Sequence, residues 1–245
     1  MRVRRENAVR HFTVRKWRGG MEREIPVEEL KKTYASGDMV KADTGGCTGC
    51  SACCKGMGSS VVLDPYDCFR LWVGTGQSFG ELLQTAAELS PQEGIVLPNL
   101  RMNGPEEACV FLNEEGRCRI HESRPGLCRL FPLGRIYEQD GFSYYLQNSQ
   151  CPRTGKAKVK IKKWLDTPEL PKYETYILRW HDLLKAIRSH FAGESDEKLK
   201  GDVNTFLLQL FYVTPWEKDC DFYAQAAVRF EKMEKLLKTI SWSEA

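Results

Sequence analysis

The distribution of cysteine constrains this chain more than any other feature of its sequence. Ten cysteines occur in 245 residues, and eight of them lie between positions 47 and 151. A chain of this length can bury a core large enough to fold without covalent cross-links, so the cluster does not serve to staple a small domain. The eight are Cys47, Cys50, Cys53, Cys54, Cys109, Cys118, Cys128 and Cys151.

The cellular compartment decides how such a cluster is interpreted. The N-terminal residues are basic, but no apolar export segment follows them. The longest apolar run, 206–213, is far shorter than the roughly 20 residues of a membrane span. We therefore expect a cytoplasmic protein with no membrane association. Thiols stay reduced in the cytoplasm, so clustered cysteines there indicate metal ligands or redox groups rather than structural disulfides.

The first cysteine block has the spacing Cys47-x2-Cys50-x2-Cys53, followed at once by Cys54. A single C-x2-C pair is common in zinc sites, whereas three cysteines at this spacing resemble an iron–sulfur run. The small residues around them let the backbone wrap closely around an ion or a cluster. We therefore expect either an iron–sulfur cluster, with the [4Fe–4S] form favoured, or zinc on these thiolates.

The sequence leaves open how the eight cysteines divide between centres. A polynuclear site would use them together, and a single four-ligand cluster would leave spare cysteines. A third arrangement has two tetrathiolate sites. These would be formed by Cys47, Cys50, Cys53 and Cys151, and by Cys54, Cys109, Cys118 and Cys128.

Two arginines and the two remaining cysteines complete the candidate residues. Arg124 and Arg129 flank Cys128, and we expect their guanidinium groups to offset an anionic centre and to donate hydrogen bonds to sulfur. Cys68 and Cys220 lie outside the cysteine blocks, so we interpret both as small buried apolar residues.

Hydrophobic periodicity predicts an α+β fold, mostly helical, with short β-hairpins around a cysteine-rich metal-binding core and a C-terminal helical bundle. We divide the chain into an N-terminal basic arm (1–45), a metal-binding domain (46–165) and a C-terminal helical region packed on it (166–245).

Local signals place individual elements. Asp64-Pro65 and Ser78 mark two helix starts, and we expect the second helix to continue to Leu89. Asp140-Gly141 predicts a hairpin. The other expected elements are a short helix at 27–34, strands at 60–63, 95–97, 110–112 and 117–120, and long helices at 173–191, 196–212 and 218–240.

The net charge of +3 does not indicate a nucleic-acid binder. A basic run follows Cys151, and its alternate spacing predicts a strand with one solvated basic face. An acidic partner is the alternative use of that face, and the identity of any protein partner or substrate stays open. The run consists of Lys156, Lys158, Lys160, Lys162 and Lys163.

The segment Cys47-Thr-Gly-Cys50-Ser-Ala-Cys53-Cys54 resembles the signature of the CxxCxxCC, or YkgJ-type, cysteine-cluster family. Residues 109–132, CVFLNEEGRCRIHESRPGLCRLFP, are similar to that family's second block, and LDPYDCFRL at 63–71 is similar to its intervening helix. The resemblance covers about 46–152. This chain has His121 where the family usually has Tyr, and we expect a hydrogen-bonded structural histidine there.

The resemblance implies a zinc- or iron-chelating domain, with an iron–sulfur cluster in some members and flagellin lysine N-methylases among its relatives. We therefore carry three hypotheses. The first is an iron–sulfur protein with a redox or protein-modifying centre, and the second is a structural zinc domain for partner binding. The third is a lysine N-methylase-like enzyme, which is weakened because the chain shows no Gly-rich loop for S-adenosylmethionine. No catalytic residue is assigned.

Overall fold

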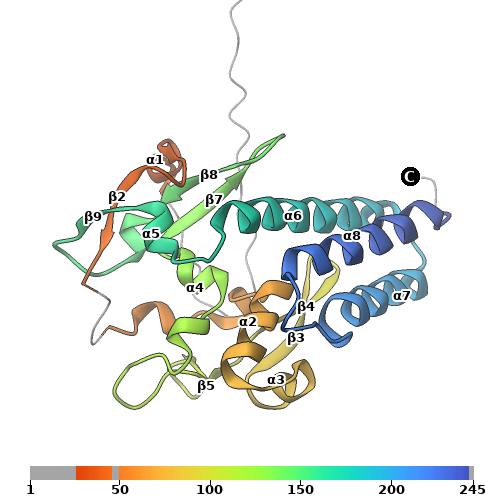
Figure 1. Cartoon of the computed structure of the whole chain (residues 1–245), viewed down its shortest axis with the longest axis horizontal. Helices are drawn as coiled ribbons and strands as arrows, with labels where there is room; N and C mark the ends of the chain where they lie inside the picture. Colours follow the sequence, from red (N-terminus) through yellow and green to blue (C-terminus); the bar gives the residue numbers. More distant parts are fainter. Residues whose placement is uncertain (1–25, 46–49, 243–245) are drawn as a thin grey trace, which may run out of the picture.

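The computed structural model describes residues 26–45 and 50–242, and Figure 1 shows its elements along the chain. Helices and small antiparallel sheets both occur, as the α+β prediction requires. Cys47 and most of the expected basic arm lie outside the described residues.

Part of the expected basic arm belongs to a sheet. The short helix α1 (Val27–Leu30) ends earlier than expected, and β1 (Thr33–Tyr34) follows it. Strand β1 pairs with β8 (Phe142–Leu146), which forms the predicted hairpin with β7 (Leu133–Tyr137). Because β8 is far away along the chain, no pattern within 1–45 indicates this pairing.

A second ribbon also includes residues from that arm. Strand β2 (Met39–Asp43) pairs with β9 (Ala157–Lys160), and the helix α5 (Ile161–Leu165) follows directly. Val40 and Val159 are opposite each other in the register and both are buried. Only Lys158 and Lys160 of the predicted basic strand lie on β9, and both are exposed. Lys156 precedes the strand, is half-buried and donates to Asn148 and to Cys151 O, while Lys162 and Lys163 lie on α5.

The two predicted capping motifs start helices. Asp64 precedes α2 (Pro65–Thr75), where its side chain accepts from Asp67 N and forms a capping box. Ser78 and Glu81 form the same motif at α3 (Phe79–Thr85). Helix α3 ends at Thr85 rather than near Leu89.

A hairpin replaces the last turn expected of α3. Strand β3 (Ala87–Gln92) pairs with β4 (Ile95–Leu100). Glu93 and Gly94 connect them with φ of 53° and 88°, the conformation of a tight primed turn. The expected strand at 60–63 is reduced to one bridge between Val62 and Asn99.

Short pieces carry the cysteine blocks. The expected hairpin at 110–120 is a turn with a single bridge between Leu112 and Cys118. The regular elements here are β5 (Met102–Asn103), β6 (Ala108–Cys109), α4 (Gly126–Leu130) and 3-10 turns at Ala52–Cys54, Gly58–Ser60, His121–Ser123 and Asn148–Gln150.

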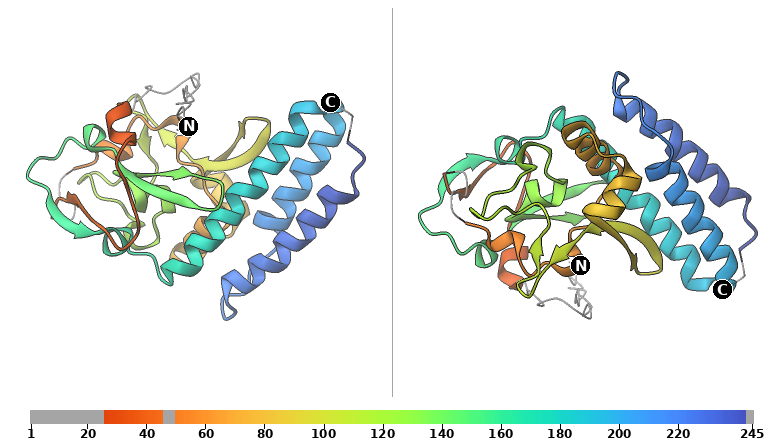
Figure 2. Two further views of the ribbon diagram at one scale, coloured as in Figure 1. Left: turned by 90° about the horizontal axis from the view of Figure 1, so that it is seen from above. Right: turned by 90° about the horizontal axis from the view of Figure 1, so that it is seen from below.

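The three predicted C-terminal helices are α6 (Leu170–Gly193), α7 (Glu197–Leu208) and α8 (Phe222–Thr239). They lie side by side on one side of the strands (Figure 2). A π-helical turn, Gln209–Val213, extends α7. The three- and four-residue spacing of apolar residues predicts one buried stripe on α8, and all five of its residues are buried: Phe222, Ala226, Phe230, Met233 and Leu237.

The same spacing predicts an apolar stripe on α6, and three of its five residues, Leu184, Ile187 and Phe191, are buried. Leu178 and His181 are only half-buried, whereas Tyr176, Ile177 and Trp180 are buried. Helix α6 packs against α8 and also against β4, so it buries more of its circumference than one stripe.

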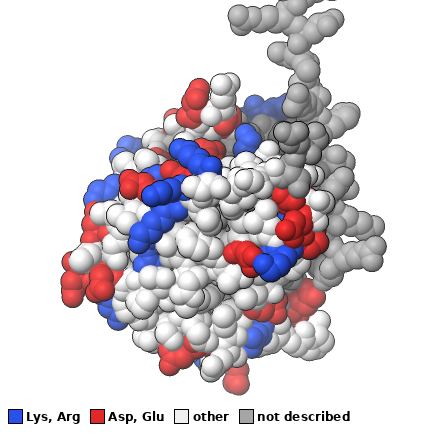
Figure 3. All heavy atoms as spheres, turned by 90° about the vertical axis from the view of Figure 1, so that its right-hand side faces the viewer, with Lys and Arg blue, Asp and Glu red and all other residues white. Residues whose placement is uncertain are grey.

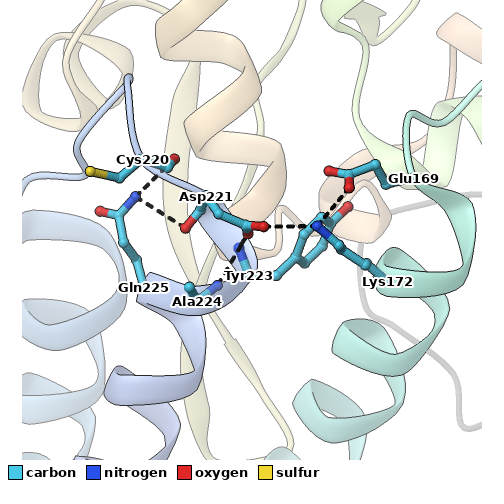
Figure 4. Close-up of polar contacts among 7 residues, drawn as sticks. All are labelled: Glu169, Lys172, Cys220, Asp221, Tyr223, Ala224 and Gln225. Atoms are coloured by element: carbon cyan, nitrogen blue, oxygen red, sulfur yellow. Dashed lines mark hydrogen bonds and ion pairs between the residues drawn. The ribbon is translucent and has the colours of Figure 1, made fainter.

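Polar contacts join α6 to α8. Lys172 Nζ lies 2.6 Å from the carboxylate of Glu169 and 2.8 Å from that of Asp221, which caps α8 (Figure 4). On the face seen in Figure 3, acidic and basic side chains lie among uncharged ones. Within the described residues, no helix combines the length and apolarity needed to cross a bilayer.

Candidate metal centre

Seven cysteines line one cavity of about 180 Å³. They come from both predicted blocks and from separate elements: the 3-10 turn at Ala52–Cys54, strand β6, helix α4 and the loops between them. Cys47 lies outside the described residues, three positions before Cys50. The seven are Cys50, Cys53, Cys54, Cys109, Cys118, Cys128 and Cys151.

Backbone contacts hold the two blocks together. Lys55 forms a bridge with Ala108, and Gly56 N donates to Glu107 O at 3.0 Å. Gly56 has a φ of 65°, in the left-handed region that favours glycine. These contacts place the turn that carries Cys53 and Cys54 beside the strand that carries Cys109.

A buried carboxylate fixes helix α4. Asp67 Oδ1 accepts from Gly126 N at 2.7 Å, at the first residue of α4, and Asp67 Oδ2 accepts from Asp64 N at 3.1 Å. One side chain thereby joins the start of α2 to the start of α4, which carries Cys128. Burial raises the pKa of Asp67 well above its usual range.

The thiols influence one another. Every pair among Cys53, Cys109, Cys118 and Cys128 interacts electrostatically. Burial raises the pKa of the last three, and the neighbouring thiols raise them further. For Cys54, the hydrogen bond with Cys53 is the largest cause of a raised pKa, followed by burial. A bound cation would favour the thiolate forms that these surroundings disfavour.

This arrangement differs from the two tetrathiolate sites considered from the sequence. That partition separates Cys53 from the second group, whereas Cys53, Cys109, Cys118 and Cys128 interact around one cavity, and Cys54 interacts with three of them as well. Within residues 26–45 and 50–242, no three acidic, His or Cys side chains close on a single point as ligands of one ion. The donor set is nevertheless rich in thiols, the ligands that both zinc and iron–sulfur clusters use.

The two predicted arginines have different surroundings. Arg124 lines the cavity, and its charge lowers the pKa of Cys118, against the larger effect of burial. Arg129 is 4% exposed and donates to backbone carbonyls, including Glu122 O and Arg124 O. Arg129 therefore holds the chain around α4, while Arg124 faces the thiols.

The two other cysteines and His121 lie in different surroundings. Cys68 is buried in the core, as predicted. The prediction for Cys220 was wrong: it is exposed, because it lies in the turn before the α8 cap Asp221 (Figure 4). His121 is exposed at the cavity, with Nε2 2.7 Å from Arg124 Nη1.

Sequence reasoning missed two residues of the site. The Asp-Pro-x-Asp pattern predicted a helix cap, but it gave no sign that Asp67 also binds Gly126 N. Trp164 lines the cavity and donates from Nε1 to Phe131 O at 3.1 Å. Its distance from the cysteine blocks in the sequence gave no signal of this role.

Comparison with known proteins agrees with the chemistry of the cavity. Residues 46–152 match the family model CxxCxxCC, described as a "Putative zinc- or iron-chelating domain". The chain is also similar to the uncharacterized protein MJ0939 of Methanocaldococcus jannaschii, at 26% identity over 194 residues. That similarity covers 76% of this chain and 60% of the relative, so the chain spans less than two thirds of the relative's length.

A search of solved structures found no match to this chain. The family match supports metal binding, and it does not distinguish zinc from iron. The resemblance predicted from the cysteine blocks is confirmed, since residues 46–152 match the CxxCxxCC family.

Proposed function

We propose that the cysteine cavity holds an iron–sulfur cluster, in the [4Fe–4S] form, for a redox or protein-modifying reaction. The observation that carries this proposal is the gathering of seven described cysteines around one cavity of about 180 Å³. A mononuclear tetrathiolate zinc site uses four. One water molecule needs ~10–15 Å³ of such space, so the cavity has room for a group of several atoms.

The spacing of the first block supports the same choice, because C-x2-C-x2-C is an iron–sulfur run. One cluster of this kind takes four thiolate ligands. We assign the cluster to Cys53, Cys109, Cys118 and Cys128. Cys50, Cys54 and Cys151 then line the cavity without being required for that cluster.

The chain's own residues shape the surroundings of the centre. Met57, Leu100 and Phe131 line the cavity together with Trp164, and such apolar walls restrict water and lower the local dielectric. Arg124 contributes positive charge beside Cys118. When bound, an iron–sulfur cluster supplies one-electron redox chemistry at a potential set by its charge, hydrogen bonds and solvent exposure.

Three Cys→Ser variants test the ligand assignment on anaerobically purified protein. We expect Cys128→Ser to lose the visible absorption of the cluster and most of its iron. Cys151→Ser should keep both, and exposed Cys220→Ser is the matched control. Loss of half the iron in Cys151→Ser would show a second centre and contradict the four-thiol assignment. Full retention in Cys128→Ser would contradict the site itself.

A further inference from the structure

Arginine side chains lie at the mouth of the cysteine cavity, together with one histidine. Arg117, His121, Arg124 and Arg153 line it together with the thiols. Arg117 and His121 are exposed, while Arg124 is half-buried. The segment from 117 to 124 therefore presents cationic groups at the place where a molecule from solvent would enter.

Two more arginines hold this segment in place through hydrogen bonds to its backbone. Arg70, on α2, and Arg129, on α4, both donate to the carbonyl of Glu122. Arg129 Nε also donates to Arg124 O at 3.0 Å. Burial, together with the charges of Arg70 and Arg124, lowers the pKa of Arg129 to about 10. We call Arg70, Arg117, Arg124 and Arg129 the cationic rim.

The cationic rim is not neutralised by carboxylates. Among the described residues, none of its four arginines forms an ion pair within 4.0 Å. Two of its buried groups, Arg70 Nη1 and Arg124 Nε, have no hydrogen-bond acceptor in the described part of the chain. Buried donors of this kind normally have a partner, so the rim has unused capacity for an acceptor.

The pKa of His121 is affected by the arginines of the rim. Burial lowers its pKa, and the charges of Arg124, Arg117 and Arg129 lower it further, against a smaller opposing effect of Asp166. Arg117 lines the cavity and is exposed, so its guanidinium group is accessible to an anion from solvent.

We infer that the cationic rim binds an oxyanion, either a carboxylate or a phosphate group, of the molecule that reaches the cysteine cavity. Guanidinium groups are planar, permanently charged and able to bind both oxygens of such a group. The inference rests on the proposed function only for its location: an anion held here would lie at the entrance to the proposed cluster.

Calorimetric titration of the full-length, anaerobically purified protein tests this inference. The probes are inorganic phosphate and succinate, which separate phosphate from carboxylate recognition. Arg117 is exposed, so Arg117→Gln should fold normally. Lys232→Gln removes the same charge from an exposed position on α8 and is the matched control.

We expect the wild type to bind at least one probe at millimolar concentration or below. Arg117→Gln should bind it about tenfold more weakly, the effect of one lost charge-assisted contact, and Lys232→Gln should match the wild type. Binding of neither probe, or equal weakening in both variants, would overturn the inference. Iron is measured on every sample, which separates the two proposals. Protein that holds iron but binds no anion would refute only the inference on the cationic rim. Protein that binds an anion but holds no iron would refute only the proposed cluster.

Discussion

Gly126 is the first residue of α4, where an added methyl group would collide with the hydroxyl of Tyr173. A Cβ at this position would lie closer than 3.0 Å to Tyr173 Oη, and 3.5 Å from both Tyr173 Cζ and Asp67 Oδ1. Tyr173 is 2% exposed and cannot swing away. Overpacking of this kind costs ~1–3 kcal/mol, while replacing Gly by Ala in a helix gains up to ~1 kcal/mol. We therefore expect Gly126→Ala to destabilise the protein by about 1–2 kcal/mol.

The same contact predicts that Gly126→Ala stops being destabilising when Tyr173 is replaced by Phe. Tyr173→Phe removes the colliding oxygen and leaves the ring carbon in ordinary contact with the new methyl group. In that background Gly126→Ala should be neutral or stabilising by up to ~1 kcal/mol, because only the helix-propensity gain remains. Urea unfolding followed by circular dichroism measures all four members of this double-mutant cycle.

Gly80→Ala is the matched control, since nothing in the described structure lies within 4 Å of a Cβ added there on α3. It should be neutral or stabilising in both backgrounds. Equal costs of Gly126→Ala with and without the Tyr173 hydroxyl would refute the reasoning. Because α4 carries Cys128, Gly126→Ala should also lower the iron content, and Tyr173→Phe should restore it.

Three further predictions concern buried and capping groups. Burial raises the pKa of Asp64 to about 6. Between about pH 4 and pH 6 the folded protein therefore holds a proton that the unfolded chain releases. The stability that this proton contributes is lost as the pH rises through that range. The free energy of unfolding of Asp64→Asn should therefore increase relative to the wild type over that range, and a constant difference would contradict the assignment. Asp221→Ala should melt at a lower temperature than Asp221→Asn, because Asn still accepts from Tyr223 N at the α8 cap; equal melting temperatures would show that the cap contributes nothing. Arg129→Met should cost at least ~2 kcal/mol in urea unfolding, because the partly buried carbonyls of Arg124 and Asp166 lose their donor, and an unchanged midpoint would show that water replaces it.

The parts of the fold predicted correctly are those with local chemical signals. Asp64 and Ser78 cap α2 and α3, and Asp140-Gly141 connects β7 to β8, because the residues that determine each feature lie within a few positions of one another. The apolar stripe of α8 is correct for the same reason. In the site, the crowding and spacing of cysteine selected eight candidates, of which seven line the cavity and Cys47 lies outside the described residues.

The parts that were missed depend on contacts between distant segments. Strands β1 and β2 form only because β8 and β9 offer free edges. Arg129 was expected to donate to sulfur, but the carbonyls that it binds come from the loop before α4 and from the end of α5. The exposure of Cys220 follows from the turn before α8, since helical periodicity does not show where the helix begins.

The most direct test of the central claim is the content of iron, zinc and acid-labile sulfide per chain in anaerobically purified protein. We expect iron and sulfide in equal amounts, about four of each per chain for a single [4Fe–4S] cluster, with little zinc. Stoichiometric zinc without sulfide would contradict it, and the cysteine cavity would then be a structural zinc site.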